Sequence, residues 1–191
     1  MAENENKYER KHLITPDEFR ALARPSSEHL DDDEVNAFIT ECEDRFIIPP
    51  LGYANYKACV TDSPFASTFD DTFKPVTLIT GGEWKQKQKC GCDAGKEILM
   101  YCCGLKKALA YFVYAKMLRS DGSIVERAGF MQHRDAYADH VNDSSKAQYN
   151  DVMGMAEKYL SDCMLYAKYH TVDKTIKPVR GSRASITAIG D

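Results

Sequence analysis

The sequence predicts a mainly α-helical protein: a small helical bundle with a β-hairpin or short strands and extended terminal tails. Two long segments, Ile98–Leu118 and Tyr149–Ala167, are rich in apolar residues as buried helices are. A glycine inside the extended-looking run Ser123–Tyr137 is typical of a hairpin. We therefore expect a flexible tail at residues 1–12, a helical domain at 13–170 with a hairpin at about 123–137, and an extended arm at 171–191.

A capping box predicts the start of the first helix. Thr15 can accept from the backbone, Pro16 suits the first helical position, and Glu18 can return a bond to Thr15.

A longer helix is predicted to have the acidic run Asp31–Asp33 at its start, because carboxylates are favoured near the positive end of the helix dipole. Its apolar face would comprise Val35, Phe38, Ile39, Cys42 and Phe46. Pro49 and Pro50 are expected to stop it. The stretch "LGYANYKACV" then indicates a turn and a short helix ending near Val60.

The centre of the chain is expected to hold the central helix. "PVTLITGG" fits a short strand or the start of a turn, and the segment up to Gly95 is polar and interrupted by glycines. Apolar residues then leave little room for a polar face between Ile98 and Leu118, which predicts one buried helix.

The last helix has the clearest periodicity in the chain. Asp143, Ser144 or Ser145 can cap it. Its apolar face comprises Tyr149, Val152, Met153, Ala156, Tyr159, Leu160, Cys163 and Ala167.

Composition excludes several classes of protein. The 191 residues carry 25 Lys and Arg against 29 Asp and Glu, a net charge of −4, whereas nucleic-acid-binding domains usually have a basic excess. No stretch approaches the roughly 20 apolar residues that span a bilayer. The polar N-terminus lacks a secretory signal, so we expect a reducing cytoplasm. Seven cysteines in that setting do not indicate a disulfide framework.

The cysteines between Lys89 and Cys103 raise the possibility of a zinc site. Cys90 and Cys92 are spaced C-x-C rather than the usual C-x2-C, and Cys102 and Cys103 would diverge on a helix. Buried packing of Cys102 and Cys103 is the simpler interpretation. A zinc-binding interaction domain that uses Cys90 and Cys92 is the alternative function. Thiol redox chemistry is less favoured, because no C-x-x-C motif starts a helix.

No catalytic constellation is recognisable. The histidines form no H-E-x-x-H pair, no G-x-S-x-G motif is present, and "TGGEWK" lacks the Gly-Lys-Ser/Thr of a phosphate loop. We therefore expect neither an enzyme nor a cofactor. Tyrosines in the two main helices, including Tyr101, suit core-edge packing or a protein interface. An interaction protein is the leading class.

Several blocks occur in one order along residues 13–169: "LITPDEF", "FITECEDRFIIPPLG", "LITGG", "GLKKALAYFVYAKMLRSDG", "ERAGFMQHRDAY" and "AEKYL". In this order they resemble the small head–tail connector (adaptor) proteins of tailed bacteriophages and prophages of Bacteroides-type hosts, including the ring proteins of crAss-like phages.

This resemblance implies a structural virion protein, made in the host cytoplasm and placed at the portal vertex. It implies a helical bundle with a projecting hairpin or loop, and a homo-oligomeric ring, commonly a dodecamer, beneath the portal. Expected partners are the ring itself, the portal protein and further tail or ring proteins. Genomic DNA would pass without sequence-specific binding, and no membrane is involved.

The extended C-terminal arm is the expected partner-binding segment. Its apolar anchors would be Ile176, Val179, Ile186 and Ile189. Lys177, Arg180 and Arg183 would meet an acidic surface on the portal or on a neighbouring subunit. A plain disordered terminus is the alternative.

Overall fold

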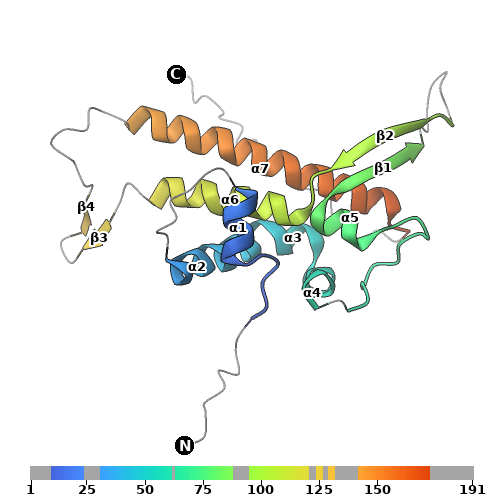
Figure 1. Cartoon of the computed structure of the whole chain (residues 1–191), viewed down its shortest axis with the longest axis horizontal. Coiled ribbons are helices and arrows are strands. Elements are labelled where there is room, and N and C mark those ends of the chain that lie inside the picture. Colours follow the sequence, from blue (N-terminus) through green and yellow to red (C-terminus); the bar gives the residue numbers. More distant parts are fainter. Residues whose placement is uncertain are drawn as a thin grey trace, which may run out of the picture.

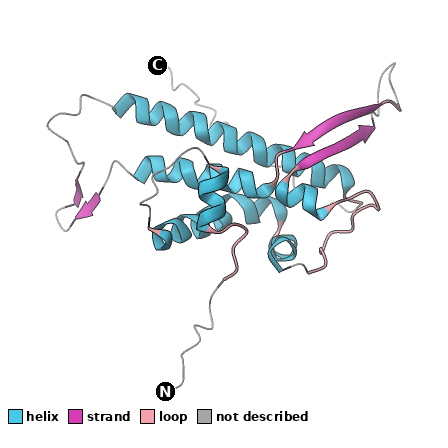
Figure 2. Cartoon of the chain, viewed as in Figure 1, coloured by secondary structure: helices cyan, strands magenta, loops and turns pink. Residues whose placement is uncertain are grey.

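The computed structural model describes residues 10–23, 31–61, 63–87, 95–120, 124–126, 129–131 and 142–172. This part of the chain is mainly helical, as the sequence predicts (Figure 2). None of its helices is long and apolar enough to cross a membrane. The helices are α1 Pro16–Leu22, α2 Asp32–Cys42, the π-helix η1 Glu43–Ile47, α3 Ile48–Leu51, α4 Tyr53–Thr61, α5 Pro75–Thr80, α6 Leu105–Ser120 and α7 Asn142–His170.

The strands form two antiparallel pairs. β1 Gly82–Lys87 pairs with β2 Glu97–Cys102, and we call this pair the ribbon. β3 Ile124–Glu126 pairs with β4 Gly129–Met131, which lies inside the range 123–137 where a hairpin was expected. The two tails expected from the sequence lie mostly outside the described residues.

The two longest helices organise the fold. α6 and α7 run antiparallel side by side, and α1 and α2 pack on the other side of α6 (Figure 1). The ribbon lies across the C-terminal part of α7 and extends away from the helices (Figure 1). α6 is therefore the central helix, as expected, although its start was predicted wrongly.

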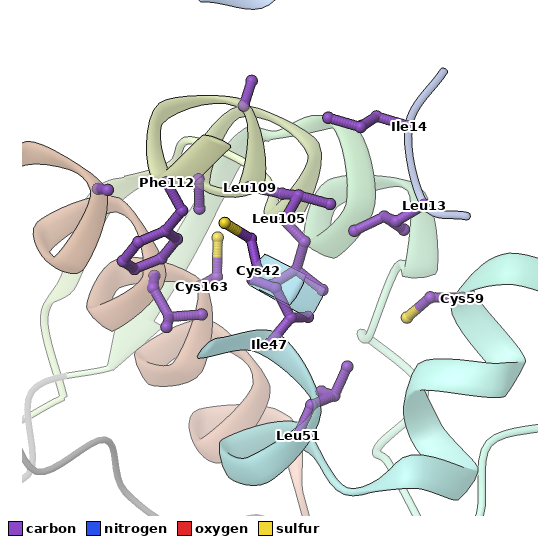
Figure 3. Packing of buried hydrophobic residues seen from close by; sticks show 14 of the residues in the cluster. Leu13, Ile14, Cys42, Ile47, Leu51, Cys59, Leu105, Leu109, Phe112 and Cys163 are labelled. Atoms are coloured by element: carbon purple, nitrogen blue, oxygen red, sulfur yellow. The ribbon is translucent and has the colours of Figure 1, made fainter. Parts of the chain in front are cut away.

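The core surrounds α6. Figure 3 shows Leu105, Leu109 and Phe112 of this helix in one cluster with Cys42 and Ile47. The ring of Phe112 also stacks on Phe46, with centroids 4.3 Å apart. The buried residues of α6 are Leu105, Ala108, Leu109, Ala110, Phe112, Val113, Ala115 and Met117.

The capping box at α1 is confirmed. The Thr15 side chain accepts a hydrogen bond from the backbone N–H of Glu18, and the Glu18 carboxylate accepts one from the backbone N–H of Thr15. Just before it, the backbone N–H of Leu13 donates to the carboxylate of Glu43 over 2.7 Å. Glu43 is fully buried in η1 and lies 2.9 Å from Nδ1 of His12. This carboxylate therefore fixes the N-terminal segment against the body.

The prediction that Pro49 and Pro50 stop the long helix is wrong. Asp31 caps α2 as expected, but helical backbone continues through η1 and α3 as far as Leu51. A proline removes one i→i−4 hydrogen bond of an α-helix. The turn just before the prolines is π-helical and uses a wider hydrogen-bond spacing, so the backbone can continue as a helix through them. The helix ends at Gly52, whose φ of 84° terminates it.

The prediction of one helix over Ile98–Leu118 is also wrong. Its first residues form β2, and α6 begins only at Leu105. Gly104, with φ of 87°, separates the two, and a Cβ there would lie 2.5 Å from the backbone nitrogen of Gly81. Two glycines thus let the base of the ribbon and the start of α6 touch. "PVTLITGG" forms neither of the expected structures, because Pro75 starts the short helix α5.

Helix α7 is confirmed, but it begins at Asn142, before the expected caps Asp143, Ser144 and Ser145. Its predicted apolar face is largely buried: Val152, Ala156, Leu160, Cys163 and Ala167 face the core. The long tertiary contact with α6 accounts for this strong signal, since a helix packed along its length needs an apolar stripe along its length.

Candidate interaction surface on the ribbon

The site residues predicted from the sequence all lie outside the described residues. These are Ile176, Val179, Arg180, Arg183, Ile186 and Ile189 of the arm. Cys90 and Cys92, the residues of the zinc alternative, also lie outside the described residues. Within the described part of the chain, no group of three or more His, Cys, Asp or Glu residues is placed to hold a metal ion. A candidate site therefore has to come from the folded surface.

The ribbon presents two different faces because successive side chains of a strand alternate. On one face Trp84 pairs across the strands with Met100, and Cys102 follows on the same side. Trp84 is 7% exposed and Cys102 is fully buried. We call this the inner face, because it packs against α7.

Aromatic rings hold the inner face on α7. The Trp84 ring centroid lies 5.4 Å from that of Tyr166, 5.1 Å from that of Tyr169 and 5.7 Å from that of His170. The hydroxyl of Tyr169 also accepts a hydrogen bond from the backbone N–H of Lys87 over 2.9 Å. Trp84 is therefore the main apolar anchor of a two-stranded sheet, which would be marginal alone.

The end of α7 is held in turn by the loop before α5. Nδ1 of His170 lies 2.9 Å from Oδ1 of Asp70 and 3.0 Å from Oγ1 of Thr72. The backbone N–H of Val172 donates to the carbonyl of Thr68 over 2.9 Å. Burial opposes ionisation of Asp70, but hydrogen bonds from Thr72 and His170 outweigh it and lower the pKa of Asp70.

The His170–Asp70 pair has the residue types of a catalytic dyad, but its position is structural. His170 is 4% exposed, and the rings of Trp84, Tyr166 and Tyr169 surround it. A general base must reach the proton that it abstracts, and this imidazole is closed off from solvent. Sequence reasoning missed the pair because its members lie 100 residues apart without any shared motif.

The outer face of the ribbon is apolar along β2 and charged along β1. We define it as Glu83, Lys85, Lys87, Leu99 and Tyr101. Leu99 and Tyr101 are each 61% exposed, and they pair across the strands with Lys85 and Glu83. Ile98 is 44% exposed, but it pairs with Gln86 on the opposite side of the ribbon and is not part of the outer face. Lys85 also forms an ion pair of 3.1 Å with Glu97, which at such exposure adds little stability.

Leu99 and Tyr101 keep most of their surface in contact with solvent. Large apolar side chains gathered on one exposed surface are typical of protein interaction sites. The ribbon also has only two strands in the described structure, so each outer strand edge keeps backbone groups that another strand could pair with. Of the tyrosines expected in the long helices, Tyr101 instead lies on this face, while Tyr166 is buried and Tyr111 packs on Tyr159.

No curated protein and no solved structure gave a significant match to this chain. One family model matches residues 47–173, about two thirds of the sequence. The matched segment begins in η1 and runs through the ribbon, α6 and α7, so it includes the candidate surface. That model describes a family of unknown function, DUF6712. The chain belongs to the DUF6712 family.

Proposed function

We propose that this protein is a structural virion component, a head–tail connector that forms a ring beneath the portal and joins the capsid vertex to the tail. The order of sequence blocks supports this proposal, as does a helical body from which a ribbon projects. The observation that carries it is the outer face of the ribbon. Leu99 and Tyr101 are 61% exposed there, on a strand pair that has no third strand among the described residues.

A ring requires one surface of each subunit to bind a different surface of the next subunit, with a rotation that closes. The outer face suits one half of such a contact. A neighbouring copy would dehydrate the apolar side chains of β2, and the charged side chains of β1 would set the register. The C-terminal arm expected at residues 171–191 would add a second contact to the portal, to the neighbour or to further tail proteins. An acidic ring would let genomic DNA slide past without sequence-specific binding.

The solution mass of the purified protein, alone and mixed with a bacteriophage portal protein, tests this function. We expect the free protein to be small and to enter a ring-sized complex on mixing, as measured by light scattering and electron microscopy. A protein that stays monomeric and ignores the portal protein would contradict the proposal.

A pair of variants tests the role of the ribbon. The double substitution Leu99→Ser and Tyr101→Ser should abolish ring formation and leave the melting temperature nearly unchanged, because both side chains are exposed. Tyr53→Ser is the matched control, since Tyr53 is 66% exposed on α4. If the ribbon variant assembles like the control, assembly does not use the outer face.

The zinc alternative predicts a different result from the same protein. A domain that uses Cys90 and Cys92 would carry about one zinc per chain and would lose stability on chelation. Elemental analysis of the sample used for the mass measurement separates the two functions.

A further inference from the structure

A pair of thiols lies beneath the base of the ribbon. Sγ of Cys102, at the end of β2, is 3.5 Å from Sγ of Cys163, in α7, and the two residues are 61 positions apart in the chain. Both side chains are fully buried, while Cys103 next to them is half-buried. The pair has no role in the proposed assembly.

The two thiols differ in chemistry. Hydrogen bonding to Cys163 lowers the pKa of Cys102, and the backbone N–H of Gly104 acts in the same direction. The hydrogen bond with Cys102, together with burial, raises the pKa of Cys163 well above its ordinary value. One thiol therefore ionises first while the other keeps its proton, which is the division of roles that thiol–disulfide exchange needs.

We propose that Cys102 and Cys163 form a redox-active dithiol that closes to a disulfide when a small-molecule disulfide such as oxidised glutathione is present. The Cys102 thiolate attacks one sulfur of the oxidant, forms a mixed disulfide and releases one thiolate. The Cys163 sulfur, once deprotonated, then attacks Cys102 and displaces the second thiolate. The protein loses two protons and two electrons, and one oxidant molecule becomes two thiols.

Access to the pair requires a local movement and not global unfolding. Cys102 is covered because the ribbon packs on α7, and a two-stranded sheet held mainly by Trp84 is among the elements that open most easily. The oxidation should therefore be slower than that of an exposed thiol and faster than global unfolding.

The disulfide would have a mechanical consequence. It would close a loop of 61 residues that contains α6 and the β3–β4 pair, and it would tie the base of the ribbon covalently to α7. Loop closure of this length should raise the melting temperature by about 10 °C. The ribbon that carries the outer face could then no longer separate from α7. This inference does not depend on the connector function.

The test uses the full chain incubated with oxidised glutathione, followed by alkylation and peptide mass mapping. Because Cys102 and Cys103 are adjacent, the Cys103→Ser variant makes the assignment unambiguous. We expect a peptide that joins Cys102 to Cys163, a loss of two hydrogens and the rise in melting temperature. Cys42 and Cys59 are the internal controls: they are buried, and burial raises the pKa of each to about 12, so they should remain reduced.

Two results would overturn the inference. One is a peptide map in which Cys102 and Cys163 are both alkylated, and therefore still reduced, although oxidised glutathione has modified Cys90 and Cys92. The other is a rise in melting temperature that persists in Cys163→Ala. If Cys163→Ala does not fold, peptide mapping of the Cys103→Ser chain still decides the outcome, because it needs no change at Cys102 or Cys163.

Discussion

Two neighbouring regions of the chain, β2 and α6, use similar apolar residues for opposite purposes. Leu109 in α6 is fully buried, whereas Leu99 in β2 is 61% exposed, although the two are ten positions apart. In α6, apolar side chains meet other elements on nearly every side. In β2, they alternate between α7 and solvent. Equal hydrophobicity in sequence therefore corresponds to stability in one region and to a free surface in the other.

The largest effect is expected when the same substitution, leucine to alanine, is made in both regions. We expect Leu109→Ala to lower the free energy of unfolding by about 2–5 kcal/mol, because it removes buried contacts and leaves a cavity. Leu99→Ala should stay within about 0.5 kcal/mol, because water already covers that side chain. Urea denaturation of both variants measures the difference. Similar losses would mean that Leu99 is buried in the folded monomer.

The junction between the regions offers a second, smaller effect. Gly104→Ala should lower the free energy of unfolding by about 3 kcal/mol, because a Cβ there would lie 2.5 Å from backbone atoms of Gly81 and Thr80. Gly52→Ala is the matched control: its φ is 84° against 87° at Gly104, but nothing lies within 4 Å of the added Cβ. It should cost only about 1–2 kcal/mol. Thermal unfolding that gives equal losses would show that the two backbones do not approach closely.

The smallest expected effect concerns the pair that holds the end of α7 beside the ribbon. The pKa of Asp70 is lowered in the folded state, so its contribution to stability is present above the unfolded value near 3.9 and is lost as pH falls through the folded value. The effect is small because the Asp70 side chain is 40% exposed. Between pH 6 and pH 2, the melting temperature of Asp70→Asn should therefore fall slightly less than that of the wild type. An identical loss in both proteins would contradict this linkage.

Local signals in the sequence were sufficient where the cause is local. The capping box of Thr15 and Glu18 was predicted correctly because all its partners lie within four residues. The acidic start of α2 and the apolar stripe of α7 were predicted for similar reasons, since helix ends and helix faces repeat over short distances.

The misjudged elements lack such local causes. The run from Ile98 to Leu118 is apolar throughout, so it has no periodicity that distinguishes a strand from a buried helix. Gly104 was the available signal for a break, and its meaning depends on Gly81 from another element. The prolines after Phe46 also appear as a helix stop until the π-helical turn before them is known.

The candidate surface and the thiol pair also depend on contacts between distant segments, which the sequence does not indicate locally. Alternation along β2 determines that Leu99 and Tyr101 share a face, but only packing of Trp84 on α7 determines that this face points to solvent. Likewise, Cys102 and Cys163 were each recognisable as core residues, and only the packing of β2 on α7 brings their sulfurs together.

By itself, then, the sequence determined the helical class, the caps of α1 and α2 and the long apolar stripe of α7, because these depend on hydrogen bonds and side-chain spacing within a few residues. The tertiary structure decided where the strand ends and α6 begins, which apolar residues stay exposed, and which thiols and ion pairs meet. The physical reason is that burial and contact are properties of two segments at once, and a pattern within one segment does not specify its partner.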